Sequence, residues 1–240
     1  YLPTTSYAYT CGEAAKTHVF YGNGMNNGPG VAAASLQDLQ TAFKQRGGLN
    51  DNEWAFELAE NEDEFAISQL YEVYRQREGE SSTVFWRWVS SIDSAPDWFQ
   101  QATEKIVSEN AKYENVVDTD LQKQVERYKN VLSEGNKVVV VAHSQGNLYA
   151  NLAYDTLRSR GLNMNSFGII SVATPDDRVA GDGPHFTRTD DRIIGAVRLV
   201  YPSTLDGNTT NTTDTGDNWL HHNFVNAYLN GDVSKPLILN

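Results

Sequence analysis

The sequence predicts an α/β fold, in which helices cover both faces of a mostly parallel β-sheet. Short apolar segments alternate along the chain with longer amphipathic ones. The run Val138–Val141 is unbroken, and an unbroken apolar strand needs cover on both faces, which helices flanking a parallel sheet provide. The 240 residues are 40% hydrophobic, which is enough apolar material for one sizeable core.

Five segments combine β-branched or aromatic residues with the Gly, Asn or Pro boundaries of strands: residues 17–23, 54–60, 137–143, 166–174 and 198–203. A short extended piece, residues 184–187, is expected after the fourth of them. Three helices are predicted between the strands, at residues 35–47, 120–135 and 148–161. The first has Ser35 and Gly47 at its ends, and the second has apolar residues at i, i+4, i+7 and i+11.

We expect a single domain over residues 1–240. No stretch approaches the roughly 18 consecutive apolar residues of a membrane-spanning helix. Nineteen basic and 31 acidic side chains give a net charge of −12, a field that repels phosphate backbones and disfavours nucleic acid as a partner. Cys11 is the single cysteine of the sequence, so no internal disulfide is expected. The sequence opens at Tyr1 without methionine, which slightly favours a secreted or extracytoplasmic location.

The chain between the strands at 54–60 and 137–143 is longer than a simple crossover requires. Residues 81–115 are predicted to be a helical cap-like insertion rich in aromatic residues: Phe85, Trp86, Trp88, Trp98 and Phe99. These side chains either cover an apolar substrate or anchor the extra helices to the core, and the sequence leaves both interpretations open. The candidate substrate-binding residues are Trp86, Trp88, Trp98 and Phe99.

The segment most informative about chemistry is Ala142-His143-Ser144-Gln145-Gly146, between the strand at 137–143 and the following helix. Small residues two before and two after Ser144 permit a tight strand-to-helix turn that lifts the serine hydroxyl off the sheet. The start of the helix adds a positive dipole and the backbone N–H of Gln145. A nucleotide-binding turn would need a series of phosphate-cradling glycines, which this segment lacks.

This segment resembles the G-x-S-x-G nucleophile elbow of the α/β-hydrolase family, in particular its small esterases and lipases. Ala142 stands where the first glycine would be, and its methyl group is small enough for the turn. The resemblance implies an α/β-hydrolase fold and Ser144 as the nucleophile of a Ser-His-Asp triad. It also implies cleavage of a small-molecule or lipid-like carboxylic ester through an acyl-enzyme, without a cofactor or a metal.

The family places the acid and then the base after the serine in the chain. His18 and His143 are interpreted as structural, and His185 is interpreted as part of the short extended piece at residues 184–187. The remaining two are adjacent, and spacing alone does not separate them. His222 is the candidate base because the following Phe224, Tyr228 and Leu229 are similar to the helix after the family's base; His221 is the alternative.

Five aspartates are candidates for the acid: Asp176, Asp177, Asp190, Asp191 and Asp206. If residues 166–174 and 184–187 are consecutive strands, the family's acid loop falls at residues 189–192. The segment Asp191-Arg-Ile-Ile also resembles the acid loop of small bacterial lipases, so Asp191 is the candidate acid. Asp190 and Asp206 remain the main alternatives.

The oxyanion hole implied by the resemblance needs two backbone N–H groups. Gln145, the residue after the serine, would supply one. The turn Asn23-Gly24-Met25 corresponds to the H-G-x segment of esterases and lipases, so the backbone N–H of Met25 is the second candidate. A plain Gly/Asn turn without a catalytic role is the alternative.

Other function classes use the same residues differently. An amidase or peptidase would employ the same triad, and a non-catalytic binding protein on a hydrolase scaffold would use the aromatic insertion as a partner surface. The polar loop at residues 206–217 contains oxygen ligands suited to calcium, but its spacing matches no EF-hand loop and we predict no metal there: Asp206, Asn208, Asp214 and Asp217.

Overall fold

The computed structural model describes residues 15–23, 29–47, 52–59, 73–78, 84, 95–102, 118–212 and 221–240. Within this part of the chain, no helix combines the length and apolar character that crossing a bilayer requires. Most of the predicted insertion at residues 81–115 lies outside the described residues.

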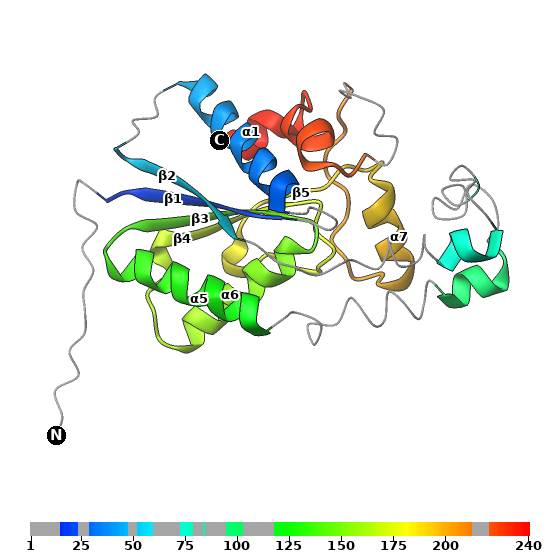
Figure 1. The fold of residues 1–240 in the computed structure, drawn as a ribbon, viewed down its shortest axis with the longest axis horizontal. Coiled ribbons are helices and arrows are strands. Elements are labelled where there is room, and N and C mark those ends of the chain that lie inside the picture. Colours follow the sequence, from blue (N-terminus) through cyan, green and yellow to red (C-terminus); the bar gives the residue numbers. More distant parts are fainter. Residues whose placement is uncertain are drawn as a thin grey trace.

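The described strands form one parallel sheet, in the order β2-β1-β3-β4-β5 (Figure 1). The strands are β1 (Thr17–Gly22), β2 (Trp54–Ala59), β3 (Lys137–His143), β4 (Phe167–Val172) and β5 (His185–Phe186). All four pairs of neighbouring strands are parallel, so the predicted α/β class with a parallel sheet is confirmed. The predicted strands at 17–23, 54–60, 137–143 and 166–174 and the short extended piece are all present.

Helices cover both faces of the sheet (Figure 1). On one face lie α1 (Pro29–Arg46), the short π-helix η4 (Phe224–Leu229) and α8 (Ser234–Leu239), which pack on one another. On the other lie α5 (Asp118–Ser133) and α6 (Gly146–Ser159). Other described elements include η2 (Met164–Ser166), η3 (Ala180–Asp182) and α7 (Arg192–Val200).

The central position of β3, with helices on both faces, explains why a run of valines forms a strand here. Val141 packs in the cluster that includes α1 and η4, whereas Val138 and Val140 pack in the cluster that includes α5 and α6. Side chains alternate between the two faces of a strand, so a strand with helices on both sides buries apolar residues at consecutive positions.

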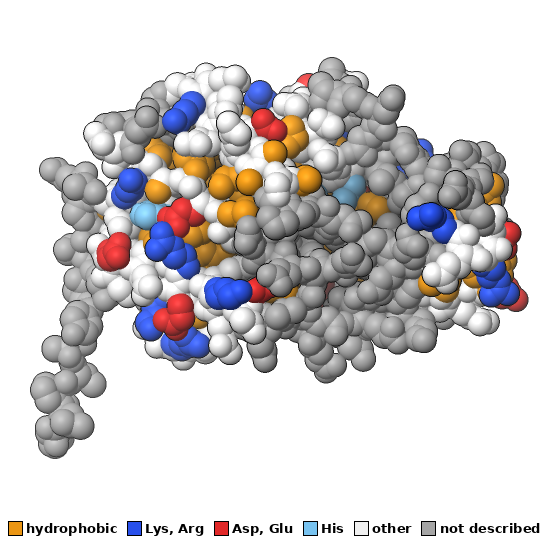
Figure 2. All heavy atoms as spheres, in the orientation of Figure 1, with side chains coloured by type: hydrophobic (Ala, Val, Ile, Leu, Met, Phe, Trp, Pro, Cys, Tyr) orange, Lys and Arg blue, Asp and Glu red, His pale blue; other side chains and the backbone are white. Residues whose placement is uncertain are grey.

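The edge strand β2 is less covered than β3. Its side chains Trp54, Phe56 and Leu58 are only half-buried and pack against the first of these clusters. Hydrophobic side chains gather over this part of the molecule (Figure 2). Glu57 on the same strand binds His18 of β1 (Nδ1 to Oε1, 2.6 Å) and Arg127 of α5.

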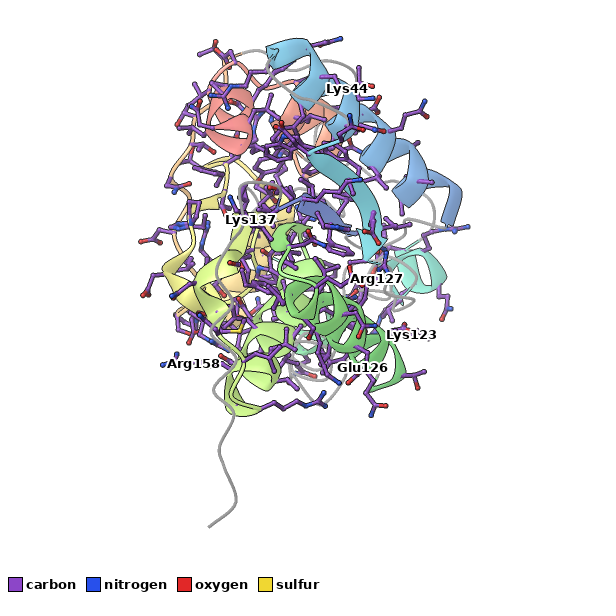
Figure 3. All side chains as sticks on the ribbon, turned by 90° about the vertical axis from the view of Figure 1, so that its left-hand side faces the viewer. Lys44, Lys123, Glu126, Arg127, Lys137 and Arg158 are labelled. Carbon is purple, nitrogen blue, oxygen red and sulfur yellow. The ribbon has the colours of Figure 1, made fainter. Side chains whose placement is uncertain are left out.

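The strands begin at the end of the molecule seen in Figure 3. Charged side chains from several elements lie there, including Lys137 at the start of β3 and Glu126 on α5. Glu126 accepts hydrogen bonds from Lys129 and from Arg160, each at 3.0 Å, and these bonds lower the pKa of its carboxyl group. The residues with candidate catalytic roles follow the strands at the opposite end.

The sequence prediction is wrong for residues 198–203. Arg198 lies in the last turn of α7 rather than in a strand. The buried residues Ile193, Ala196 and Val197 recur at helical spacing, and the side chain of Asp191 caps the helix by accepting a hydrogen bond from the Ile194 N–H. Helix α1 also begins six residues before the predicted Ser35, at Pro29, a residue favoured in the first turn of a helix.

Candidate active site

Ser144 occupies a strained turn between β3 and α6. Its φ of 53° lies in the left-handed region, which costs an L-residue roughly 1–2 kcal/mol. The turn is held by β4, because the N–H of Ser144 donates to the carbonyl of Val172 at 3.0 Å. The side-chain amide of Asn147 donates to the carbonyls of both Ser144 (2.9 Å) and Val172 (3.0 Å). These bonds hold the serine at the carboxyl end of the sheet.

Gly146 allows α6 to begin against the backbone of β1. A Cβ atom at this position would lie 2.6 Å from the carbonyl oxygen of Gly22 and 2.9 Å from that of Asn23. Both contacts are with backbone, which cannot rotate away as a side chain can. The structure therefore requires glycine at the fifth position of the Ala142–Gly146 segment.

We expect Gly146→Ala to destabilise the protein by about 2–3 kcal/mol, since the added methyl pushes α6 away from β1. The matched control is Gly195→Ala, also in a helix, where a Cβ meets nothing within 4 Å and the change is expected to stabilise by up to about 1 kcal/mol. Urea unfolding of both variants checks this. Equal free energies of unfolding would contradict the steric argument.

Ser144, His222 and Asp191 form one hydrogen-bonded chain. The ring nitrogen Nε2 of His222 lies 3.0 Å from Oγ of Ser144, and Nδ1 lies 2.8 Å from Oδ2 of Asp191. All three residues are buried, with exposed fractions of 0%, 9% and 2% respectively. An ionised carboxylate only accepts, so the proton of the imidazole is on Nδ1 and the lone pair of Nε2 faces the serine hydroxyl.

Both oxygens of the Asp191 carboxyl group have further donors. As the N-cap of α7, it accepts the N–H of Ile194 on Oδ1 at 2.9 Å. On Oδ2 it accepts the hydroxyl proton of Tyr228 at 2.6 Å, in addition to the His222 contact. Tyr228 was part of the family-like pattern after His222, but nothing in the sequence indicated its contact with the acid.

His143 supports the loop that carries His222. Its Nε2 donates to the carbonyl oxygen of His222 at 2.8 Å, and the two rings lie 4.9 Å apart. Burial lowers the pKa of His143 well below its usual range, and a positive charge on His222 adds to this effect. His143 therefore stays neutral and keeps one ring N–H for the carbonyl.

The alternative base and acid are paired with a buried arginine. Arg188, 1% exposed, donates from Nε and Nη2 to the two carboxylate oxygens of Asp190, at 2.8 Å each. Its Nη2 also lies 2.6 Å from Nδ1 of His221. The bond from Arg188 lowers the pKa of Asp190. The structure thus brings His222 and Asp191 to Ser144 and binds His221 and Asp190 to Arg188.

The other candidates have contacts elsewhere. Asp176 accepts a hydrogen bond from the side-chain amide of Asn151 at 2.6 Å. Asp206 is exposed, and its carbonyl oxygen lies 3.3 Å from Nε2 of His185. The candidate acid that lies beside Nδ1 of His222 is therefore Asp191.

Several candidate residues lie outside the described part of the chain: Met25, Phe85, Trp86, Trp88, Asp214 and Asp217. Of the remaining ones, Gln145 is buried and occupies the turn ahead of α6. Trp98 lies under the guanidinium of Arg77 at 4.6 Å, and the buried ring of Phe99 meets that of Tyr74 edge-on. Within the described ranges, no three His, Cys, Asp or Glu side chains gather as a metal site would need.

No protein-family model matches the chain, and no curated protein sequence matches it significantly.

Proposed function

We propose that the protein is a serine hydrolase with an α/β-hydrolase fold that cleaves carboxylic esters. The observation that carries the proposal is the hydrogen-bonded chain from Ser144 through His222 to Asp191. The positive φ of Ser144 and its place between a parallel strand and a helix add support, because α/β-hydrolases hold their nucleophile in this way. The chain order of serine, acid and base is also that of the family.

In the proposed reaction, Oγ of Ser144 attacks the acyl carbonyl while Nε2 of His222 takes the hydroxyl proton. The carboxylate of Asp191 holds the proton of the imidazole on Nδ1 and stabilises the imidazolium ion. His222 then gives its proton to the departing alcohol, leaving an ester bond between Ser144 and the acyl group. Water repeats the cycle with His222 as base and releases the carboxylic acid.

The negative oxygen of the tetrahedral intermediate needs donors in place before the reaction. The backbone N–H of Gln145 is the first, because it follows the nucleophile and precedes α6, whose dipole favours negative charge at its start. Met25 remains the proposed second donor, on the evidence of its sequence context alone. The substrate is proposed to be a small-molecule or lipid-like ester.

Two measurements test the proposal together. The protein is expected to hydrolyse p-nitrophenyl esters within the series from acetate to palmitate. A fluorophosphonate reagent is expected to label it once, on the peptide that contains Ser144, because only an activated serine displaces fluoride from phosphorus. Hydrolysis combined with labelling elsewhere would reject Ser144 as the nucleophile. A protein that is inert to every ester and to the reagent would favour a binding role.

A further inference from the structure

The hydroxyl of Tyr228 has two fixed partners beside the candidate triad. Its oxygen accepts the backbone N–H of Arg188 at 3.1 Å and lies 2.6 Å from Oδ2 of Asp191. A backbone N–H can only donate, so the hydroxyl proton of Tyr228 points to the carboxylate. The ring is fully buried among the core residues of η4 and α1, which fixes the direction of this bond.

The surroundings of this hydroxyl favour its protonated form. Burial, followed by the charge of Asp191, raises the pKa of Tyr228 well above its usual range. Tyr228 is thus a permanent donor, and Oδ2 of Asp191 receives two donors at once, the hydroxyl of Tyr228 and Nδ1 of His222.

We propose that Tyr228 is a positioning residue that sets how strongly Asp191 holds the proton of His222. A donor on Oδ2 draws negative charge away from the side of the carboxylate that faces the imidazole. Asp191 then stabilises the imidazolium less than it would without this donor. The imidazole ring of His222 therefore stays neutral, and able to act as a base, down to a lower pH. The role in catalysis rests on the proposed function, whereas the effect on the His222 proton does not.

The other polar and charged groups around His222 do not reproduce this effect. His143, packed on the His222 ring, is kept neutral by burial. Arg188 is a buried cation, and its guanidinium is bound to Asp190 and His221. Ser144 faces Nε2, the other side of the ring. Every variant of Tyr228 keeps these groups of the described part of the chain. A comparison of the variants therefore isolates the effect of the Tyr228 hydroxyl.

The test is the titration midpoint of the His222 ring, followed by NMR and assigned by its loss in His222→Gln. Tyr228→Phe is expected to raise this midpoint by about 0.5–1 pH unit, because Oδ2 of Asp191 then has one donor fewer and stabilises the imidazolium more strongly. The acid limb of the kcat/KM profile for p-nitrophenyl acetate is expected to move upward by the same amount.

Two further variants make the result specific. Tyr128→Phe removes a buried tyrosine hydroxyl that donates to Gln124 at 3.3 Å on the other face of the sheet, and is expected to leave the midpoint unchanged. Site-specific replacement of Tyr228 by 3-fluorotyrosine keeps the hydroxyl but makes it a stronger donor, and is expected to lower the midpoint. It also decides the question if Tyr228→Phe does not fold.

An unchanged or lowered midpoint in Tyr228→Phe, or an equal shift in Tyr128→Phe, would overturn the inference. So would a raised midpoint with 3-fluorotyrosine. If the protein is inert to every ester while the two Tyr228 variants shift the midpoint in opposite directions, the proposed function fails and the inference about the His222 proton stands.

Discussion

Ser144→Ala is expected to lower kcat/KM for p-nitrophenyl esters by about 10⁴-fold or more, because the acyl-enzyme cannot form without Oγ. The loss should fall on kcat, since the contacts that bind the substrate remain. Alanine also leaves β3, α6 and the bonds of the turn to Val172 in place, so the free energy of unfolding should change little. Steady-state kinetics together with urea unfolding separates the two effects.

The matched control for this prediction is Ser159→Ala. Ser159 is exposed near the end of α6, and its hydroxyl donates only locally, to the carbonyl of Thr156 at 2.8 Å. We expect parental kinetics from it. Residual activity of Ser144→Ala above about a hundredth of the parental kcat would show that another group is the nucleophile.

Asp191→Asn is expected to lower kcat by roughly 10³–10⁴-fold with little change in KM. With the asparagine oxygen kept on the Ile194 N–H, as the N-cap requires, the amide NH₂ takes the place of Oδ2. There it faces Nδ1 of His222 and the Tyr228 hydroxyl, both of which donated to the carboxylate. The imidazole adopts the other tautomer, and its Nε2–H can no longer take the proton of Ser144.

Asp206→Asn is the control for this change, because it alters an exposed aspartate that the sequence also offered as the acid. Its kcat should equal that of the parent. The pH profile of Asp191→Asn adds a second criterion: raising the pH should restore part of the lost rate, because hydroxide can then remove the serine proton in place of His222. A loss below about tenfold in Asp191→Asn would reject Asp191 as the orienting acid.

Strands and helices were predictable where a single local cause determines them. The valine run of β3 favours a strand covered on both faces, because valine is β-branched, and this strand carries Ser144 to the end of the sheet. Residues 198–203 were mispredicted because a short apolar segment fits either period, and what decides for a helix is a cap seven residues earlier, at Asp191.

The pairing at the site was less accessible to sequence reasoning. His221 and His222 are neighbours, as are Asp190 and Asp191, so spacing cannot assign their directions. The backbone of His221 has a φ of 54°, which turns consecutive side chains to different partners. Tyr228 lies 37 residues from Asp191 in the chain, and only the packing of η4 against the sheet brings its hydroxyl to the carboxylate. These are tertiary effects without a local pattern.

The carboxyl group of Asp191 starts a helix and orients a candidate base at the same time. Opening of the first turn of α7 therefore releases the imidazole even when the sheet stays intact. The amide of Ile194, which is bound to the same carboxyl group, exchanges its hydrogen with solvent only through such openings. The exchange rate of this amide therefore reports how often the contact between Asp191 and His222 opens, and it can be measured without a substrate.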